Sequence, residues 1–195
     1  QTHAAGAEAE VDFADLWIVL AGVKTKVFLF TLRLSYSGKA IHRAYATASQ
    51  EAFLDGHRYA FEQLGGIPTR HIRYDNLKAA VSRVLMGRTR VESERWVTFR
   101  SHYGFDVFYC RPGVDGAHEK GGVEGEGGRF RRTHTVPMPK VDSIADLNAY
   151  FARCDVKDDH RRIGQRSNTV GDDFAVEQAL LRPLPGEAFE TGIVL

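Results

Sequence analysis

Apolar residues in the first fifty positions recur with the two-residue period of β-strands. In one run Leu32, Leu34 and Tyr36 are separated by single polar residues, so alternate side chains would face opposite sides of a sheet. An apolar run precedes it and a shorter run follows, with turns at residues 21–22 and 37–38. Short connections join antiparallel strands. The pattern therefore predicts a three-stranded meander over residues 11–20, 26–36 and 40–46.

Helical spacing begins after this meander and then alternates with extended pieces. Ser49 is positioned to cap a helix, and Gly65 followed by Pro68 is a stop signal. The extended residues 70–75 imply a strand beside the first one, reached by a helical crossover. The fold class predicted is α/β, with a central mixed five-stranded sheet flanked by helices. The later elements expected are a helix at 93–103, a strand at 105–109, a helix at 118–132 and a helix capped by Ser143.

Length and composition set the predicted domain limits. With 195 residues and 43% hydrophobic content, the chain is long enough for one well-buried domain and a tail. Residues 1–10 are expected to be disordered or a linker, and residues 11–139 to form the domain. Residues 140–195 are expected to be a helical extension that becomes an irregular peripheral arm beyond Asp155, leading toward a missing C-terminal domain. Because the sequence begins with Gln1, we interpret it as a fragment.

The charge balance bears on the class of partner. There are 26 Lys and Arg residues against 25 Asp and Glu, which gives a formal net charge of +1. A protein that binds DNA through one domain alone is usually more basic, because phosphate neutralisation dominates nucleic-acid affinity. The balance suits a catalytic core whose main DNA-binding modules lie elsewhere.

Cysteine usage and hydropathy indicate the compartment. Cys110 and Cys154 are the only cysteines, which disfavours both a zinc site and a disulfide framework. No apolar stretch approaches the ~18 residues of a membrane-spanning helix. We therefore expect a reduced cytoplasmic protein that contacts no membrane.

Three acidic residues in different local contexts are the candidate chemistry. Asp12 lies inside the first apolar run, Asp75 closes a later strand, and Glu124 lies at the start of a helical segment. Clustered carboxylates repel one another and need cations to stay ionised, and hard oxygen ligands select Mg²⁺ or Mn²⁺. Two such ions activate a nucleophile and stabilise the leaving oxygen in phosphodiester chemistry. In this interpretation Asp12 bridges both ions, and the other two acids each complete one site.

Each of the first two acids also has a plainer interpretation. Asp12 could be a strand residue that faces solvent, and Asp15 is its nearest rival for the site. Asp75, followed by Asn76, could belong to an ordinary turn or cap the next helix. Their order and contexts favour the metal site over these alternatives.

The third acid lies in a glycine-rich segment beside two rivals. Glu124 could be a solvated helix residue, and Glu119 or Glu126 could take its place. Helix geometry favours Glu124, because Lys120 and Arg131 lie on nearly its face whereas Glu126 points away. Each interior glycine costs a helix roughly 0.5–1 kcal/mol relative to Ala. We therefore expect this helix to fray without metal and DNA, at Gly121, Gly122, Gly125, Gly127 and Gly128.

Four short motifs follow one another in these contexts, at residues 11–13, 34–37, 74–81 and 119–125. Together they resemble the catalytic core of IstA-type transposases of the insertion sequence 21 family, which are relatives of retroviral integrases. The resemblance covers roughly residues 11–139.

This resemblance implies a ribonuclease-H-like fold and a DDE triad of Asp12, Asp75 and Glu124 that binds two Mg²⁺ or Mn²⁺ ions. The implied activity is metal-dependent cleavage of DNA ends and transfer of the 3′-hydroxyl to target DNA. It also implies a homo-oligomer, a helper AAA+ ATPase and DNA-binding domains outside this sequence. The implied location is the bacterial cytoplasm, at the nucleoid.

Polar and basic residues near the acids are candidate DNA contacts, although such residues are as often solvated. Asn76 and Lys78 follow the second acid closely enough to touch a scissile phosphate. Positive charge beside the third acid would hold the DNA backbone. These cations are Lys120, Arg129, Arg131 and Arg132.

Two other function classes stay open at this point. One is a structure-directed nuclease of the same fold that hydrolyses DNA without joining it, since water and a 3′-hydroxyl are interchangeable nucleophiles. The other is a non-catalytic assembly module. A metal-binding titration separates the module from either enzyme.

Overall fold

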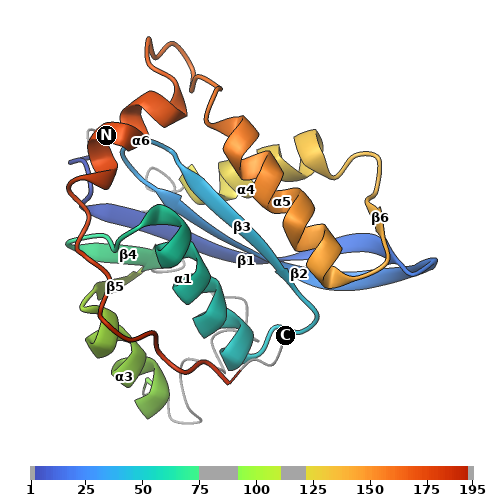
Figure 1. Ribbon diagram of the computed structural model, residues 1–195, viewed down its shortest axis with the longest axis horizontal. Helices are drawn as coiled ribbons and strands as arrows, with labels where there is room; N and C mark the ends of the chain where they lie inside the picture. Colours follow the sequence, from blue (N-terminus) through green and yellow to red (C-terminus); the bar gives the residue numbers. More distant parts are fainter. Residues whose placement is uncertain (1–2, 75–91, 111–121, 193–195) are drawn as a thin grey trace.

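A computed structural model describes residues 3–74, 92–110 and 122–192 of the protein, the side chains of residues 122–124 excepted. Its centre is a mixed sheet with the strand order β3-β2-β1-β4-β5, as Figure 1 shows. The first three strands form the predicted antiparallel meander, and β4 and β5 run parallel to β1. The five-stranded mixed sheet is thus confirmed. Its strands are β1 (Glu8–Leu20), β2 (Val23–Leu34), β3 (Ala40–Tyr45), β4 (His71–Tyr74) and β5 (Asp106–Tyr109).

A short strand that was not predicted extends this sheet. It is β6 (Lys140–Val141), which pairs in parallel with Val19 and Leu20 at the end of β1. On the same side of β1, residues 8–11 pair with β4 and residues 19–20 pair with β6, so residues 12–18 lie between these two pairings.

Helices cover both faces of the sheet. Residues from the first two helices pack in one apolar core, and residues from the next two pack in a second core. The helices are α1 (Gln50–Leu64), α3 (Glu94–Tyr103), α4 (Gly122–His134), α5 (Ile144–Asp158) and α6 (Val170–Gln178). None of the helices in the described part of the chain has the length and apolar character needed to span a bilayer.

Local signals fix most element ends where they were expected. The β1–β2 hairpin turns at Ala21 and Gly22, with φ values of 47° and 83°, and a positive φ at both central residues matches the twist of the flanking strands. Ser49 caps α1 by accepting a hydrogen bond from the Ala52 N–H, and Gly65 ends the helix at a φ of 72°. These predictions are confirmed.

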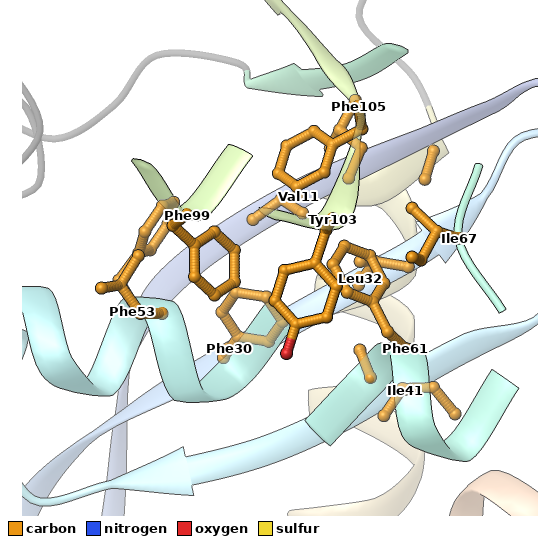
Figure 2. Close-up of a cluster of buried hydrophobic side chains, with 14 of the residues drawn as sticks. Val11, Phe30, Leu32, Ile41, Phe53, Phe61, Ile67, Phe99, Tyr103 and Phe105 are labelled. Atoms are coloured by element: carbon orange, nitrogen blue, oxygen red, sulfur yellow. The ribbon is translucent and has the colours of Figure 1, made fainter. Parts of the chain in front are cut away.

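The alternation of β1 side chains separates the two cores. Val11 and Phe13 face α1 and α3, in the aromatic-rich core shown in Figure 2. Leu16 and Ile18 face the opposite way, toward α4 and α5. Because successive strand residues point to opposite faces, Asp12 belongs to the face that α4 covers.

The N-terminal boundary was predicted too late. Strand β1 begins at Glu8, three residues before the expected start of the domain. The residues before it are also held, because the carbonyls of Gly6 and Ala7 accept hydrogen bonds from the N–H groups of Thr69 and Arg70. Pairing with a distant segment orders these residues, so those from His3 onward are not a disordered linker.

The C-terminal arm was also assigned wrongly in its described part, up to residue 192. The buried carboxylate of Glu177 in α6 accepts hydrogen bonds from the N–H groups of Gly6 and Ser37, each at 3.0 Å. Farther along, Leu181 joins the main core and Phe189 packs against it. The buried Glu177 carboxylate needs these two N–H donors, because buried polar groups must be hydrogen-bonded. The segment is therefore packed on the sheet rather than peripheral.

Candidate active site

Asp12 lies on β1 against helix α4, in a partly buried position opposite Thr31 of β2. The residue of α4 above it is Gly127. A Cβ atom added there would lie 3.6 Å from Oδ2 of Asp12. The helix backbone therefore passes directly over the carboxylate with no side chain of residue 127 between them.

The strand that leads to the second acid is firmly placed. Tyr74 ends β4 in register with Val11, the residue before Asp12. The Tyr74 side chain is buried, and its hydroxyl donates a hydrogen bond to Nε2 of His57 at 2.8 Å. Asp75 itself lies outside the described residues, as do Asn76 and Lys78.

The third acid lies on the described backbone of α4. Glu124 precedes Gly127 by three residues, and residues three apart lie on the same face of a helix. Phe130 continues this face and is buried in the core beside β1. Position 124 therefore lies on the face of α4 that contacts β1, although its side chain is outside the described set, as is Lys120.

Glu126, the rival of Glu124 in this helix, has other partners. Its side chain is only 4% exposed and accepts a hydrogen bond from Arg161 at 2.6 Å. Arg129 also donates to it, through Nε at 3.1 Å and through Nη2. These two guanidinium groups neutralise the carboxylate, so its function in the structure is to tie α4 to the segment after α5.

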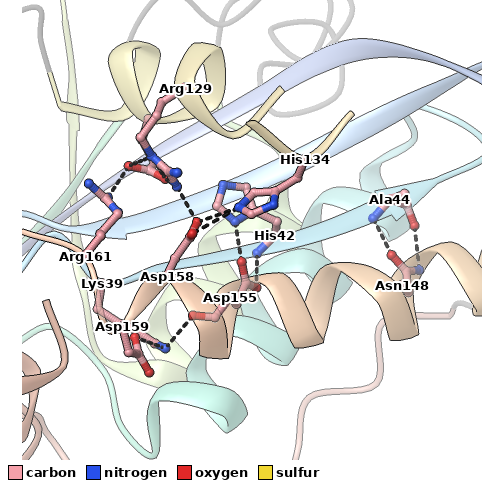
Figure 3. A network of polar contacts seen from close by, with 11 residues as sticks. Lys39, His42, Ala44, Arg129, His134, Asn148, Asp155, Asp158, Asp159 and Arg161 are labelled. Carbon is pink, nitrogen blue, oxygen red and sulfur yellow. Dashed lines mark hydrogen bonds and ion pairs between the residues drawn. The ribbon is translucent and has the colours of Figure 1, made fainter. Parts of the chain in front are cut away.

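Arg129, expected at the DNA, is committed to the same ionic network. Its guanidinium pairs with both Glu126 and Asp158, the last residue of α5 (Figure 3). Burial alone would lower the pKa of Arg129, but these two carboxylates outweigh it and raise the pKa. Of the other predicted cations in α4, Arg131 donates to the Asp15 carbonyl at 3.4 Å and Arg132 is exposed.

Asp158 completes this network on the α5 side. His134 Nε2 lies 3.0 Å from its Oδ1 and 3.1 Å from its Oδ2, the oxygen that Arg129 also contacts. Burial favours a raised pKa for the Asp158 carboxyl, but hydrogen bonds and charge from Arg129, and then from His134, lower it below the usual value. Sequence reasoning missed Asp158, His134 and Arg161, because their partners are distant in the chain.

The chemistry available here is that of carboxylate oxygens in a partly buried position between β1 and α4. Asp12 supplies hard oxygen ligands, which suit Mg²⁺ or Mn²⁺, and the bare backbone at Gly127 leaves room above them. Within the described part of the chain, no three His, Cys, Asp or Glu side chains are grouped as metal ligands. Asp75 and the Glu124 carboxylate fall outside that search.

The fold is similar to that of retroviral integrases. A chain of the simian T-cell lymphotropic virus intasome, solved in complex with PP2A regulatory subunit B56 gamma, superposes with a TM-score of 0.67 at 13% identity, over 96% of this chain and 60% of that chain. The HTLV-2 integrase catalytic core domain in complex with magnesium gives 0.62 at 13% identity, over 89% of this chain and 99% of that one. The ribonuclease-H-like fold is thereby confirmed.

Sequence comparison adds bacterial relatives and a family. The chain is 34% identical over 183 residues to the transposase for insertion sequences IS1326/IS1353 of Pseudomonas aeruginosa, across 93% of this chain and 36% of that protein. It is 29% identical over 187 residues to the transposase for insertion sequence element IS21 of the same organism, across 92% of this chain and 45% of that protein. The chain thus spans less than half the length of these relatives. Residues 5–114 match the integrase core domain, and the chain belongs to the integrase core domain family.

Proposed function

We propose that this chain is the catalytic core of a DNA transposase, which cleaves transposon ends and transfers their 3′-hydroxyl groups to target DNA. The relatives named as transposases support the substrate class. The observation that carries the proposal is the parallel pairing of β1 and β4, which ends with Val11 opposite Tyr74. The residue that follows each of them in the sequence is an aspartate, Asp12 after Val11 and Asp75 after Tyr74.

In the proposed site, these two aspartates and Glu124 hold two Mg²⁺ ions. The residues fit such ions, because carboxylates are the ligands that Mg²⁺ prefers and Gly127 leaves space at Oδ2 of Asp12. The HTLV-2 integrase catalytic core domain, which has the same fold, was solved in complex with magnesium. When bound, the ions would activate the nucleophile and stabilise the leaving oxygen. Asp12 would hold the ions together with Asp75 and Glu124.

DNA contacts in this proposal come from both sides of the site. Asn76 and Lys78 follow the second aspartate and would position the scissile phosphate. On the α4 side, Arg131 and Arg132 are better placed than Arg129, whose charge is taken up by Glu126 and Asp158. Lys120 would add to this surface.

We further propose that the full-length protein works as a homo-oligomer with a helper AAA+ ATPase, at the nucleoid in the bacterial cytoplasm. The transposase relatives, with less than half their length covered by this chain, leave room for the additional DNA-binding domains that such an assembly needs. Weak, salt-sensitive DNA binding by this chain alone follows from its net charge of +1.

The test is a comparison of two aspartates on one strand. Asp12→Asn should abolish stabilisation by Mn²⁺ in thermal unfolding and abolish cleavage of transposon-end duplexes. Asp15→Asn is the matched control, because Asp15 is exposed and its Oδ2 lies 3.9 Å from Nζ of Lys26 on the neighbouring strand. It should leave both readouts unchanged.

The same experiment separates the alternatives. Shortened DNA strands without joined products would favour a nuclease that only hydrolyses. A wild-type melting curve that Mn²⁺ does not move, together with no cleavage, would favour the non-catalytic module. At a free Mn²⁺ concentration of 100 times its Kd, binding should raise the free energy of unfolding of the wild type by about 2.7 kcal/mol.

A further inference from the structure

We propose that Arg161, in the loop after α5, is a positioning residue for the metal site. It binds Glu126 and thereby fixes the first turns of α4, which carry Glu124. This inference rests on the proposed function. It concerns a residue that touches neither metal nor DNA and acts through the helix.

Helix α4 needs support from outside because its own sequence weakens it. Four of its first seven residues are glycine, and glycine has the largest backbone entropy to lose in a helix. A Cβ atom added at Gly125 would meet no atom within 4 Å in the described part of the chain. The part of the helix around Glu124 is therefore held by the few contacts that its other side chains make.

Glu126 makes one of these contacts. Its side chain is 4% exposed, and Arg161 Nη2 lies 2.6 Å from its Oε2. Without Arg161 this buried carboxylate would keep only Arg129, a residue of α4 itself, and would lose half of its compensating charge. Arg161 is therefore the partner that ties Glu126 to a segment outside the helix. Glu126 is two residues from Glu124, and a shift of one would carry the other with it.

The Arg161 side of this contact is itself rigid. Its N–H donates to the Asp158 carbonyl at 3.2 Å, and its own carbonyl accepts from the Val170 N–H at 2.9 Å. It is thus held between the end of α5 and the start of α6. Helix α6 is anchored in turn by Glu177 on Gly6 and Ser37. A continuous set of contacts therefore runs from the residues that flank β1 and β2 to α4.

A separate set of contacts docks α5 on the sheet without involving α4. Asn148 accepts from the Ala44 N–H at 2.7 Å and donates to the Ala44 carbonyl at 3.0 Å (Figure 3). Asp155 accepts from the His42 N–H at 2.9 Å. Loss of Arg161 should therefore loosen the first turns of α4 while α5 stays in place, and Asn148 of α5 offers a control outside α4.

The test compares Arg161→Gln with Asn148→Ala in Mn²⁺ titration calorimetry and amide hydrogen exchange. Arg161→Gln should weaken Mn²⁺ affinity about tenfold, as loss of a group outside the ligands typically does, and speed exchange in α4 without metal. Arg161→Lys, which keeps the charge without the planar guanidinium, should recover part of the affinity. Asn148→Ala should lower the melting temperature with unchanged Mn²⁺ affinity.

Equal Mn²⁺ affinity in wild type and both Arg161 variants would overturn the inference, and so would an equal loss in Asn148→Ala. If Arg161→Gln does not fold, Arg161→Lys alone carries the comparison. Failure of the proposed function looks different. In that case wild type binds no Mn²⁺, or Asp12→Asn binds it as well as wild type does, whatever residue 161 is.

Discussion

Gly127 faces the carboxylate of Asp12 so closely that a methyl group added at residue 127 would lie 3.6 Å from Oδ2. That is an ordinary van der Waals distance, so alanine fits. The backbone of Gly127 is not in the left-handed region, in contrast to Gly65 and Gly104. Neither backbone strain nor a steric clash therefore requires glycine at residue 127.

The first prediction compares two glycines of α4. Gly127→Ala should place a methyl group where a hydrated ion would approach Asp12, and so reduce Mn²⁺ affinity and DNA cleavage at least tenfold. Gly125→Ala is the control, because its methyl group would meet nothing within 4 Å. Both changes should stabilise the helix by up to about 1 kcal/mol. Similar activity in the two variants, assayed on one DNA substrate, would refute the spatial role of Gly127.

The second prediction concerns the effect of His57 on how the stability of the folded protein depends on pH. His57 is fully buried, its Nδ1 donating to the Phe53 carbonyl at 2.7 Å while Nε2 accepts from the Tyr74 hydroxyl. Burial lowers the pKa of His57 to about 3. An unfolded histidine titrates near pH ~6.5, so between these values the unfolded state binds a proton that the folded state does not. The contribution of His57 to the free energy of unfolding is therefore complete above pH ~6.5. It falls by about 1.4 kcal/mol for each pH unit below that value.

Urea unfolding at pH 7, 6 and 5 measures this slope. His57→Gln keeps an acceptor for Tyr74 but does not titrate. It should lower stability at pH 7 and flatten the decline between pH 7 and pH 5 relative to wild type. Parallel curves for the two proteins would mean that His57 is protonated without cost in the folded state.

The sequence predicted elements well where the signal is local. A capping hydroxyl acts on an N–H three residues away, as Ser49 does at Ala52, and the same arrangement recurs when Ser143 accepts from Asp146. Strand alternation likewise predicted the second strand, in which Leu32 and Leu34 both face the main core. Such patterns depend on neighbouring residues, so they can be recognised without the fold.

The ionic network could not be predicted in this way. Arg129 was expected at the DNA because it lies in a basic run, yet its partner Asp158 comes 29 residues later. Arg161 and Glu126 are 35 residues apart. No period or motif links such positions, and only the packing of α5 beside α4 makes them partners. The early start of β1 has the same origin, since residues 6 and 7 are ordered by a segment more than sixty residues away.

The third prediction tests the close packing of α1 on β2. A Cβ atom at Gly56 would lie 2.5 Å from the ring of Phe30, which is fully buried. Gly56→Ala should therefore destabilise the protein by about 1–3 kcal/mol through overpacking, although alanine is the better helix former. Adding Phe30→Leu to this variant should recover part of the loss in urea unfolding. A Gly56→Ala protein as stable as wild type would show that the helix can move away from the strand at no cost.

The fourth prediction asks whether α6 unfolds together with the sheet. Glu177 is fully buried and accepts from the N–H groups of Gly6 and Ser37, so one carboxylate joins three distant segments. Glu177→Gln would turn one acceptor oxygen into a donor facing another donor, which should cost about 1–3 kcal/mol in the free energy of unfolding. Glu187→Gln, at an exposed position, should change it by less than about 0.5 kcal/mol. If both variants unfold as wild type does in urea, α6 contributes nothing to the cooperative unit and the segment after α5 behaves as the loose arm that its sequence alone suggests.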